Sequence, residues 1–585
     1  MKQASHAAWR YNLVLMLILL AVAGLGVRQS WLLREDAGRA VRRAERQQRM
    51  VLPLPARPGS IFARTARRYV PLAASRQVPS CYADGLLIPD SKLDEVAIAV
   101  ADALDMDPRD VQDKLLARRE NRFIWLKREI TDAQADAVRA LRLRALGITH
   151  EWRREYPSGD LAATVIGFRR TDGVAGAGLE LTQDAFLAAE GGQRVVLADA
   201  RRRAIWPLLA ESRAPRDGRH VMLCLDAVIQ EYLQNALAEA VAKHDAKWGA
   251  GVVVDPATGE VLAMCSVPTY DPNQYNVADA EQQTNRTITT PYEPGSVFKP
   301  IIAAAAVELG LVSYETNVFC ENGTYQAPRG GRISDHGHSY GSISLEDGVV
   351  YSSNICMAKV GEMLGNETIH AVVRSFGFGE ETGVELPGES AGIVRPIAKW
   401  DGYSLRRVPF GQEISASTMQ LAMAFSALAN GGLLLRPRLI DQVTDDEGRV
   451  LLRGGRQVVR RVLSPAVAAR SLAVMEQVVQ RGTGKACRMK KWTSFGKTGT
   501  AQIAGPGGYV DEAFTSSFVG GAPTSDPRLI CVISVYWPRT GGHYGSTVAA
   551  PYVRQVLEQS LTYLGVPPDR TSDAVPLATS GYMAD

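Results

Sequence analysis

A run of 17 uncharged residues near the start of the chain, from Tyr11 to Val27, most limits how the chain can fold. As a helix this run would be roughly 26 Å long, which is just enough to cross the apolar part of a bilayer. A cleaved signal peptide is the alternative, because Ala21-Val22-Ala23 resembles a cleavage site. The length of the apolar run favours an uncleaved, single-pass anchor.

Composition excludes several classes of protein. The hydrophobic fraction of 46% and the charged fraction of 22% are those of a globular protein, and 585 residues correspond to roughly three to four domains. The net charge of +4 is mild and spread along the chain, so nucleic acid is not an expected partner. The seven cysteines lack CxxC or His-interleaved spacing, so we expect no zinc, iron-sulfur or redox site. If the bulk of the chain is outside the cytoplasm, some of these cysteines could form disulfides, and one cysteine must stay unpaired because the number is odd.

Patterning along the chain gives a provisional division into segments. We expect a short tail at 1–10, the anchor at 11–27, a charged juxtamembrane helix and Pro-rich linker at 28–60, a first α+β domain at 61–218, a second α+β domain at 219–570, and a disordered tail at 571–585. The arginines between 39 and 49 are expected on a solvated helix face, with contact to lipid headgroups as the alternative.

The two domains differ in their predicted elements. The first has helix patterns at 91–104 and 131–145 and nothing that looks catalytic. The second opens with a helix from Asp226, its expected N-cap, to Lys243, followed by a hairpin with its turn at 256–259. Further elements of the second domain are helices between 297 and about 430, strands near 493–503, 515–521 and 528–537, and a helix over 548–564. This order predicts an antiparallel sheet flanked by helices.

Three short motifs in the second domain indicate chemistry. Ser296 and Lys299 form an SxxK that follows a Pro-Gly turn and opens an apolar run, so both side chains should lie on one face of a helix start. Such a motif is expected roughly once by chance in a chain of this length. It is followed in order by Ser352-Ser353-Asn354 and by Lys497-Thr498-Gly499. The ordered set SxxK, SxN, KTG is typical of penicillin-binding proteins and class A β-lactamases.

The residue types suit acyl transfer through a serine. Ser296 needs a neutral base within hydrogen-bond reach, and Lys299 can serve if burial and the nearby cation Lys497 lower its pKa. The helix N-terminus adds positive potential, and backbone N–H groups of Ser296 and of the strand carrying Thr500 could hold the oxyanion. Ser352 offers a hydroxyl that can relay a proton to the leaving amine, and Asn354 offers an amide for Lys299 and a substrate carbonyl.

The KTG strand suits an extended peptide. Gly496 and Gly499 have no side chains, so a peptide could lie along this strand edge and pair with its backbone. Thr498, Thr500 and Lys497 could receive a terminal carboxylate. We therefore expect catalytic roles for Ser296, Lys299, Ser352, Asn354 and Lys497, and substrate binding by Thr498, Gly499 and Thr500.

With these motifs and their flanks, the chain resembles class B penicillin-binding proteins, which are membrane-anchored peptidoglycan D,D-transpeptidases. The resemblance covers roughly residues 220 to 566 and includes GVVVDPATGEVLAMCSVPTYDPN, FGFGEETGVELPGE and FGQEISASTMQLAMAFSALANGG. Upstream, REYPSGDLAATVIGF and GAGLE resemble the pedestal domain of the family, which implies structural roles for Arg154 and Glu180. The opening of the pedestal departs from the family pattern, because Ala63 stands where an aspartate is usual.

The resemblance implies a reaction and partners. A D-Ala-D-Ala stem peptide would acylate Ser296 and lose its terminal D-Ala, and the acyl group would pass to an amine of a neighbouring stem. β-Lactams would mimic the donor. The usual partners are a polytopic glycosyltransferase and other cell-wall synthesis proteins. FGQEIS and the LTYLGVPPD ending look more like the septal, cell-division type than the elongation type. A D,D-carboxypeptidase, a β-lactamase and a non-catalytic sensor remain alternatives, although no ExxxN of the deacylating kind follows the SxN.

The implied substrate also decides the orientation of the anchor. Only Lys2 and Arg10 precede it, whereas Arg28, Arg34 and three more arginines up to residue 43 follow it, which favours a cytoplasmic bulk. Long domains often translocate regardless of charge. We therefore expect residues 1–10 in the cytoplasm, the anchor in the inner membrane and the bulk in the periplasm.

Two further patterns are set aside as ordinary loops. Asp335-His336-Gly337-His338 contains two histidines in a Gly-rich segment, for which a polar loop is the simpler interpretation than a metal site. Gly482-Thr483-Gly484-Lys485 lacks the first glycine and the final hydroxyl of a phosphate loop, since Ala486 follows. We expect neither a cofactor nor a metal.

Overall fold

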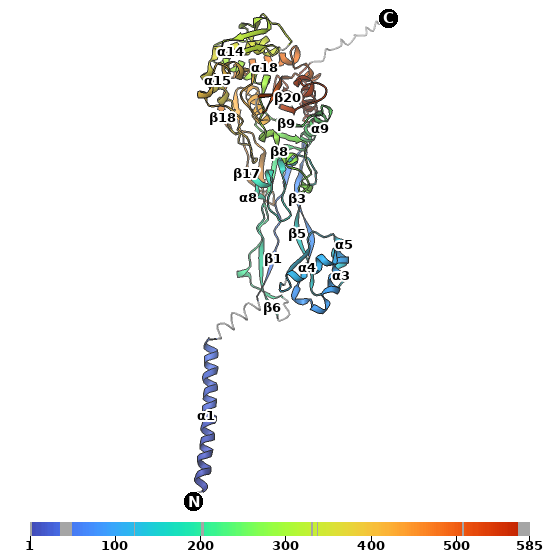
Figure 1. Ribbon diagram of the computed structural model, residues 1–585, viewed down its shortest axis with the longest axis vertical. Coiled ribbons are helices and arrows are strands. Elements are labelled where there is room, and N and C mark those ends of the chain that lie inside the picture. Colours follow the sequence, from blue (N-terminus) through green and yellow to red (C-terminus); the bar gives the residue numbers. More distant parts are fainter. Residues whose placement is uncertain are drawn as a thin grey trace, which may run out of the picture. The chain divides into compact units, whose positions relative to one another are not determined.

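The computed structural model describes residues 3–35, 49–121, 123–199, 204–328, 331–335, 337–505 and 508–570 (Figure 1). Most of the predicted juxtamembrane helix, the predicted disordered tail at 571–585 and His336 lie outside these residues. The described residues form two compact units. One takes those within 1–57, 79–152 and 189–217, and the other takes those within 58–78, 153–188 and 218–585.

The N-terminal helix α1 runs from Gln3 to Glu35. Its segment Trp9–Leu32 has a mean hydropathy of 2.0, and none of it is buried by the rest of the chain. The prediction of one apolar helix long enough to cross a membrane is confirmed, and the helix continues beyond the predicted span of 11–27 at both ends.

Besides α1, the first unit contains a three-stranded sheet, a second set of paired strands and three helices. Strand β6 (Gly192–Ala198) lies between β1 (Arg49–Leu54) and β7 (Ala204–Pro207). Strand β4 (Ile124–Lys127) pairs with the end of β3 (Tyr69–Ala83), which also pairs with β5 (Leu146–Glu155), and the helices are α3 (Leu93–Leu104), α4 (Pro108–Ala117) and α5 (Asp132–Ala140).

The two helices predicted here are present, but the second is shorter than predicted. Helix α5 begins with a capping box between Thr131 and Gln134, which satisfies its first N–H groups. It ends at Ala140 instead of residue 145, because Arg142 adopts a left-handed conformation with φ of 51° that a helix cannot contain.

The second unit begins with a sheet in the order β17, β16, β8, β2, β3. The first four strands are β17 (Val450–Arg453), β16 (Ile440–Thr444), β8 (His220–Asp226) and β2 (Ile61–Arg64). Ala63, where the family pattern has an aspartate, is fully buried in β2. A small apolar side chain therefore fits that position in the core.

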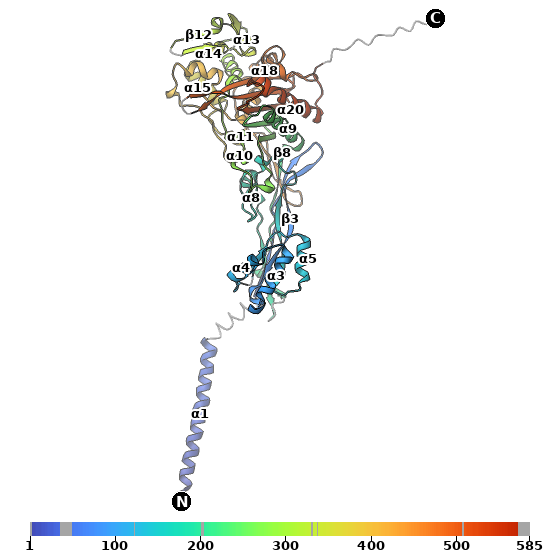
Figure 2. The ribbon, with the colours of Figure 1, turned by 45° about the vertical axis from the view of Figure 1, so that its right-hand side comes forward.

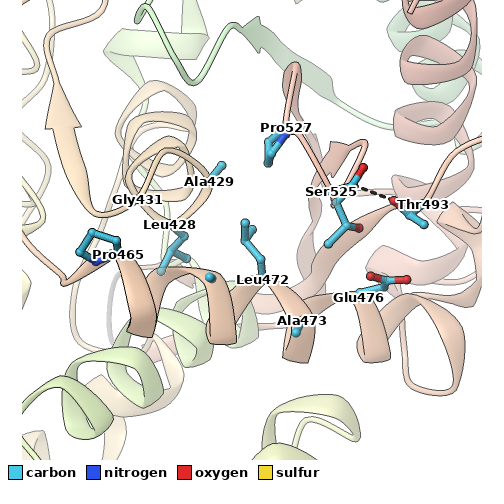
Figure 3. Close-up of a pocket in the computed structure, with 12 residues that line it drawn as sticks. Leu428, Ala429, Gly431, Pro465, Leu472, Ala473, Glu476, Thr493, Ser525 and Pro527 are labelled. Atoms are coloured by element: carbon cyan, nitrogen blue, oxygen red, sulfur yellow. Dashed lines mark hydrogen bonds between the residues drawn. The ribbon is translucent and has the colours of Figure 1, made fainter. Parts of the chain in front are cut away.

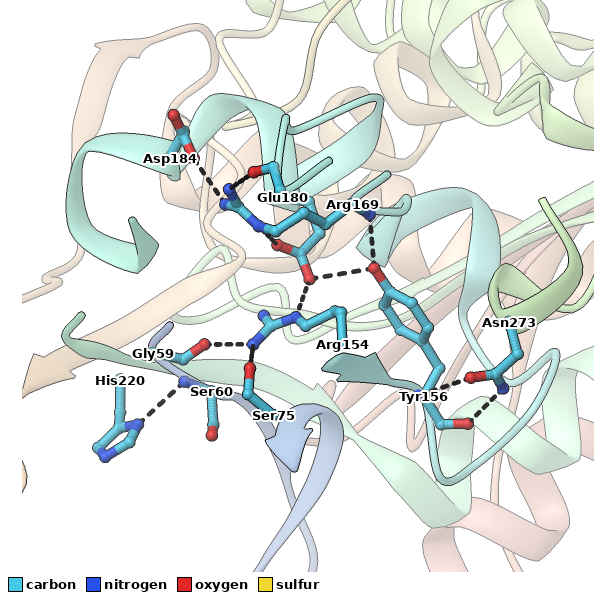
Figure 4. Close-up of polar contacts among 11 residues, drawn as sticks. Gly59, Ser60, Ser75, Arg154, Tyr156, Arg169, Glu180, Asp184, His220 and Asn273 are labelled. Carbon is cyan, nitrogen blue, oxygen red and sulfur yellow. Dashed lines mark hydrogen bonds and ion pairs between the residues drawn. The ribbon is translucent and has the colours of Figure 1, made fainter. Parts of the chain in front are cut away.

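A buried polar network lies beside this sheet (Figure 4). The carboxylate of Glu180, on α7 (Gly178–Thr182), is fully buried. It accepts hydrogen bonds from Arg154 Nε at 2.6 Å, Arg169 Nε at 3.2 Å and the Tyr156 hydroxyl at 3.3 Å. Two arginines thus neutralise one buried carboxylate, which agrees with structural roles for Arg154 and Glu180.

The second unit is built around a five-stranded antiparallel sheet. The strands, in spatial order, are β10 (Val261–Val267), β9 (Trp248–Val254), β21 (Leu529–Tyr536), β20 (Gly508–Ala522) and β19 (Phe495–Gly505). The predicted hairpin and the three predicted strands are all present, and β19 is an edge strand.

Helices cover both faces of this sheet. On one face Val253 and Ile533 pack against α9 (Ala227–Lys243) and α20 (Ala550–Tyr563), which lie side by side in Figure 2. On the other face Val252 and Val532 belong to a core that includes α12 (Lys299–Glu308), α17 (Thr418–Ala429) and α18 (Pro465–Gln480). The predicted antiparallel sheet flanked by helices is confirmed.

The remaining elements are short or belong to the helical segment between β10 and β19. The helices are α6 (Ala163–Ile166), α8 (Asp184–Leu187), α10 (Ala280–Gln283), α11 (Arg286–Thr289), α13 (Leu345–Val350), α14 (Asn354–Leu364), α15 (Asn366–Ser375), α16 (Ser404–Arg407) and α19 (Gly545–Val548), and the strands are β11 (Asn317–Phe319), β12 (Thr324–Ala327), β13 (Gly331–Ser334), β14 (Ser342–Ser344), β15 (Leu433–Leu435) and β18 (Val458–Arg461).

Candidate active site

The turn that carries Ser296 is held tightly from two sides. Ser296 lies in a 3₁₀ turn, Gly295–Phe298, which runs directly into α12. Gly295 has φ of 56°, and its N–H donates to the carbonyl of Gly411 at 3.0 Å. A Cβ on Gly411 would lie 2.1 Å from the Gly295 oxygen. Only glycine allows this approach, which fixes the position of the serine.

Lys299 is the first residue of α12 and is fully buried. Its Nζ donates to the backbone oxygen of Ser352 at 2.5 Å and to Asn354 Oδ1 at 2.7 Å, and it lies 3.1 Å from Ser352 Oγ. The SxxK and SxN motifs, 53 to 55 residues apart, therefore meet at this amine.

Ser352 adopts an unusual backbone conformation between α13 and α14. Its φ is 64°, in the left-handed region that non-glycine residues rarely occupy. This conformation presents the carbonyl and the hydroxyl of one residue to the same amine of Lys299. Strain of this kind, of the order of 1 kcal/mol, persists where surrounding contacts hold it and is typical of functional sites.

Lys497 reaches the same hydroxyl from β19. It is fully buried, and its Nζ donates to Ser352 Oγ at 3.0 Å and to Thr498 Oγ1 at 3.2 Å. Ser352 Oγ thus lies between the amines of Lys299 and Lys497. All three predicted motifs are brought together around this one oxygen.

Burial governs the protonation of both lysines. It lowers the pKa of Lys299 to about 7, against the opposing effects of the Asp335 carboxylate and the Cys356 thiol. The pKa of Lys497 is also well below its ordinary value, through burial and then through repulsion from Lys299. We expected the repulsion to act on Lys299. Repulsion between two amines is mutual, and in the structure it appears on Lys497.

The hydroxyl of Ser296 makes no hydrogen bond to any residue that the structure describes. The two N–H bonds of a neutral Lys299 amine are taken by the Ser352 carbonyl and by Asn354 Oδ1, both of which only accept. The lone pair of that amine is then left to accept from a hydroxyl, and the Ser352 hydroxyl lies 3.1 Å away. Contacts between a nucleophile and its base often tighten only with substrate bound.

Strand β19, which carries Lys497-Thr498-Gly499, lies close to the turn that carries Ser296. A side chain on Gly499 would meet Ser517 Oγ at 2.3 Å and the carbonyl of Pro294 at 3.0 Å. The glycine is thus required by the protein's own packing, in addition to the expected space for a peptide. Thr500 accepts a hydrogen bond from the N–H of Gly545 at 3.2 Å. One edge of β19 pairs with β20, and the other has no strand partner in the described sheet.

Two residues of the site were missed by the motifs. Asp335, which is 7% exposed, accepts hydrogen bonds from Asn354 N at 2.6 Å, Ile355 N at 3.1 Å and Ser353 Oγ at 2.7 Å. Thr483 Oγ1 lies 3.0 Å from Thr498 Oγ1. The sequence around each residue suggested an ordinary loop, since Asp335 stands beside two histidines and Thr483 stands in a Gly-rich turn.

The cysteines and one cluster of possible metal ligands lie outside this site. The seven cysteines, all among the described residues, are free and buried. Cys224, Glu260 and Asp441 place possible metal-ligand atoms within 4.8 Å of one another. Arg438 makes ion pairs with both carboxylates, at 2.5 Å to Glu260 and 3.3 Å to Asp441, so these oxygens already have a cationic partner.

A pocket of about 440 Å³ lies elsewhere on the second unit (Figure 3). Its walls come from the end of α17, from α18 and from the segment between β20 and β21, and none of its residues belongs to the predicted site. Its lining residues are Leu428, Ala429, Gly431, Pro465, Ala469, Leu472, Ala473, Glu476, Thr493, Thr524, Ser525 and Pro527.

Two family models match the chain. The penicillin binding protein transpeptidase domain matches residues 249–558, and the penicillin-binding protein dimerisation domain matches residues 53–223. The first match alone covers more than half of the chain and contains every predicted site residue.

Relatives and solved structures agree with these matches. The chain is 31% identical to the probable peptidoglycan D,D-transpeptidase PenA of Neisseria meningitidis serogroup A, over 97% of this chain and 95% of that protein. It is 29% identical to the peptidoglycan D,D-transpeptidase FtsI of Escherichia coli, over 97% and 94%. A crystal structure of penicillin binding protein 3 from Mycobacterium tuberculosis, complexed with aztreonam, superposes with a TM-score of 0.68 at 27% identity, over 89% of this chain and 98% of that one.

These findings confirm the resemblance and the predicted fold class. The chain belongs to the penicillin-binding protein transpeptidase family, with a dimerisation domain before its transpeptidase domain.

Proposed function

We propose that this chain is a peptidoglycan D,D-transpeptidase that works through an acyl-enzyme on Ser296. The reaction class rests on membership of the family and on relatives named as D,D-transpeptidases, which confirm the predicted class of enzyme. The observation that carries the residue roles is the meeting of Lys299, Ser352 and Lys497 at one hydroxyl.

Acylation begins with proton removal from Ser296. The neutral form of Lys299, whose pKa is about 7, accepts this proton while Ser296 Oγ attacks the carbonyl of the penultimate D-Ala. A general base is most effective when its pKa lies near the working pH. Backbone N–H groups of Ser296 and of β19 stabilise the oxyanion.

Loss of the terminal D-Ala needs a proton on its amine. Ser352 Oγ, in contact with both lysines, passes a proton toward the leaving amine, and the serine hydroxyl is restored from Lys299 or Lys497. Asn354 holds Lys299 in place and offers its amide to the donor peptide. In the second half-reaction the same groups take the proton from the acceptor amine.

The donor peptide binds along β19. Its backbone pairs with the open edge of the strand near Gly499, as an added strand does in other peptide complexes. Its terminal carboxylate is bound by Thr498, Thr500 and Lys497. β-Lactams enter the same place, open on Ser296 and remain attached.

The cellular setting follows from the anchor and the family. The chain spans the inner membrane once through α1, with residues 1–10 in the cytoplasm, a pedestal at 61–218, a transpeptidase domain at 219–570 and the bulk in the periplasm. It serves septal wall synthesis beside a polytopic glycosyltransferase and other cell-wall proteins. The similarity to FtsI supports the septal role.

The test is the intact mass of the full chain in detergent after treatment with benzylpenicillin. We expect the wild type to gain the mass of one penicillin, mapped to the peptide of Ser296, and Ser296→Ala to gain none. The adduct should persist for hours. Rapid release of hydrolysed drug would instead indicate a β-lactamase, and an adduct on another residue would reject the assignment.

A further inference from the structure

We propose that Asp335 is a positioning residue for acylation, whose carboxylate holds the Ser352-Ser353-Asn354 turn against the amine of Lys299. This proposal rests on the proposed function of the site. It concerns a residue outside the three motifs, in the segment that follows β13.

The carboxylate of Asp335 forms a clamp, defined as its hydrogen bonds to Ser353, Asn354 and Ile355. Oδ1 accepts from the backbone N–H groups of Asn354 at 2.6 Å and Ile355 at 3.1 Å, and Oδ2 accepts from Ser353 Oγ at 2.7 Å. Ser353 Oγ in turn accepts from the N–H of Cys356 at 3.0 Å. Together these bonds satisfy the first N–H groups of α14, which would otherwise be orphaned.

The clamp fixes the atoms that touch Lys299. Asn354 donates through Nδ2 to the carbonyl of Ser334, the residue before Asp335, at 3.1 Å. This bond directs Asn354 Oδ1 toward Lys299 Nζ. The segment Ser334–Asp335 thus holds both the backbone and the side chain of Asn354, and it limits where the strained Ser352 can place its oxygens.

Asp335 also brings a negative charge near a buried amine. The groups facing Lys299 are Asp335, Cys356 on α14 and Lys497 on β19. The Asp335 carboxylate raises the pKa of Lys299, in opposition to burial, so that the amine keeps enough basicity to take the serine proton. Removing this charge should lower the pKa further.

The test compares Asp335→Asn with wild type in the full chain in detergent. The second-order rate of labelling by a fluorescent penicillin is measured from about pH 5 to pH 9. We expect a rate about 10- to 100-fold lower at pH 7, because the turn and the base are misplaced, and an acidic inflection at lower pH than in wild type. A merely structural role would lower the rate and leave the inflection where it was.

Asp569→Asn is the matched control. Asp569 also accepts hydrogen bonds from one backbone N–H and two hydroxyls, of Thr493 and Ser525, but it is not among the groups that shift the pKa of either lysine. Its rate and inflection should equal those of wild type. If the wild type is labelled on Ser296 but Asp335→Asn keeps the wild-type rate or inflection, the proposed role of Asp335 is wrong and the proposed function stands. If the wild type is not labelled at all, the proposed function is wrong.

A second variant decides the outcome if Asp335→Asn fails to fold. Ser353→Ala removes one bond to the clamp and keeps the charge of Asp335. We expect its labelling rate to fall several-fold with the inflection unchanged. A Ser353→Ala protein that labels at the wild-type rate would show that the turn does not need the clamp.

Discussion

At the scale of single residues, the site is defined by two amines that share one hydroxyl. Lys299 and Lys497 are both fully buried, and neither makes an ion pair among the described residues. Burial of an amine disfavours its charged form, so the fold gives up stability to obtain a base that is neutral near pH 7.

This cost should appear as a pH dependence of stability. The pKa of Lys299 falls from 10.5 to about 7 on folding, so between these values the unfolded chain binds the extra proton and stability rises with pH. Lys299→Met removes this effect. The free energy of unfolding of the variant, minus that of wild type, should therefore fall by about 3 kcal/mol between pH 7 and about pH 9.5.

Chemical denaturation of both proteins at the two pH values measures this difference. The control is Lys243→Met, which removes an exposed lysine from the last turn of α9. A difference that stays constant or grows with pH would show that the folded Lys299 keeps its ordinary pKa.

At the scale of elements, sequence patterns predicted regular structure well. Asp226 was expected to cap the helix that ends at Lys243, and in α9 its carboxylate accepts from Val228 N and Ile229 N. Helix periodicity and cap chemistry are local, so a sequence carries them directly. The end of α5 and the clamp by Asp335 were not predictable, because they depend on the backbone conformation of Arg142 and on a contact across 19 residues.

The buried network around Glu180 allows a prediction at this scale. Glu180→Gln removes the charge that neutralises Arg154 and Arg169, so we expect the free energy of unfolding to fall by about 3–5 kcal/mol. The control is Asp184→Asn, because Asp184 pairs with Arg169 and is 46% exposed, and its loss should cost about 1 kcal/mol or less.

Thermal or chemical unfolding of both variants measures these losses. Penicillin labelling of the folded fraction should be unaffected in each, because the network touches none of the predicted catalytic residues. If both substitutions lower the free energy of unfolding by the same amount, burial of the Glu180 charge is not the reason for its contribution to stability.

At the scale of the whole molecule, the motifs predicted the family and the meeting of three distant segments, and the order of the helix and strand patterns predicted the sheet. The motifs SxxK, SxN and KTG contain Lys299, Ser352 and Lys497, which meet at Ser352 Oγ. They do not contain Asp335, which holds the turn in place. The reason is physical: groups that meet substrate are restricted in type, whereas a supporting carboxylate can come from any segment that packs nearby.

The anchor gives a prediction for the intact chain. A protein that begins at residue 49 lacks α1 and should be soluble without detergent, yet it should react with fluorescent penicillin at the rate of the full chain, because the described site lies entirely within the second unit. Fractionation of cell extracts, with labelling of each fraction, checks both points. A shortened protein that folds but no longer reacts would tie the chemistry to the membrane segment.

The central claim is that a neutral Lys299 takes the proton of Ser296. Its most direct test is the pH dependence of the second-order rate of acylation by benzylpenicillin, with the adduct mapped by mass spectrometry. The account predicts a rate that rises with pH through an inflection near 7, with the adduct on Ser296, and a loss of about 10²- to 10⁴-fold in Lys299→Ala. A wild-type rate independent of pH, or a Lys299→Ala variant that is acylated at the wild-type rate, would contradict it.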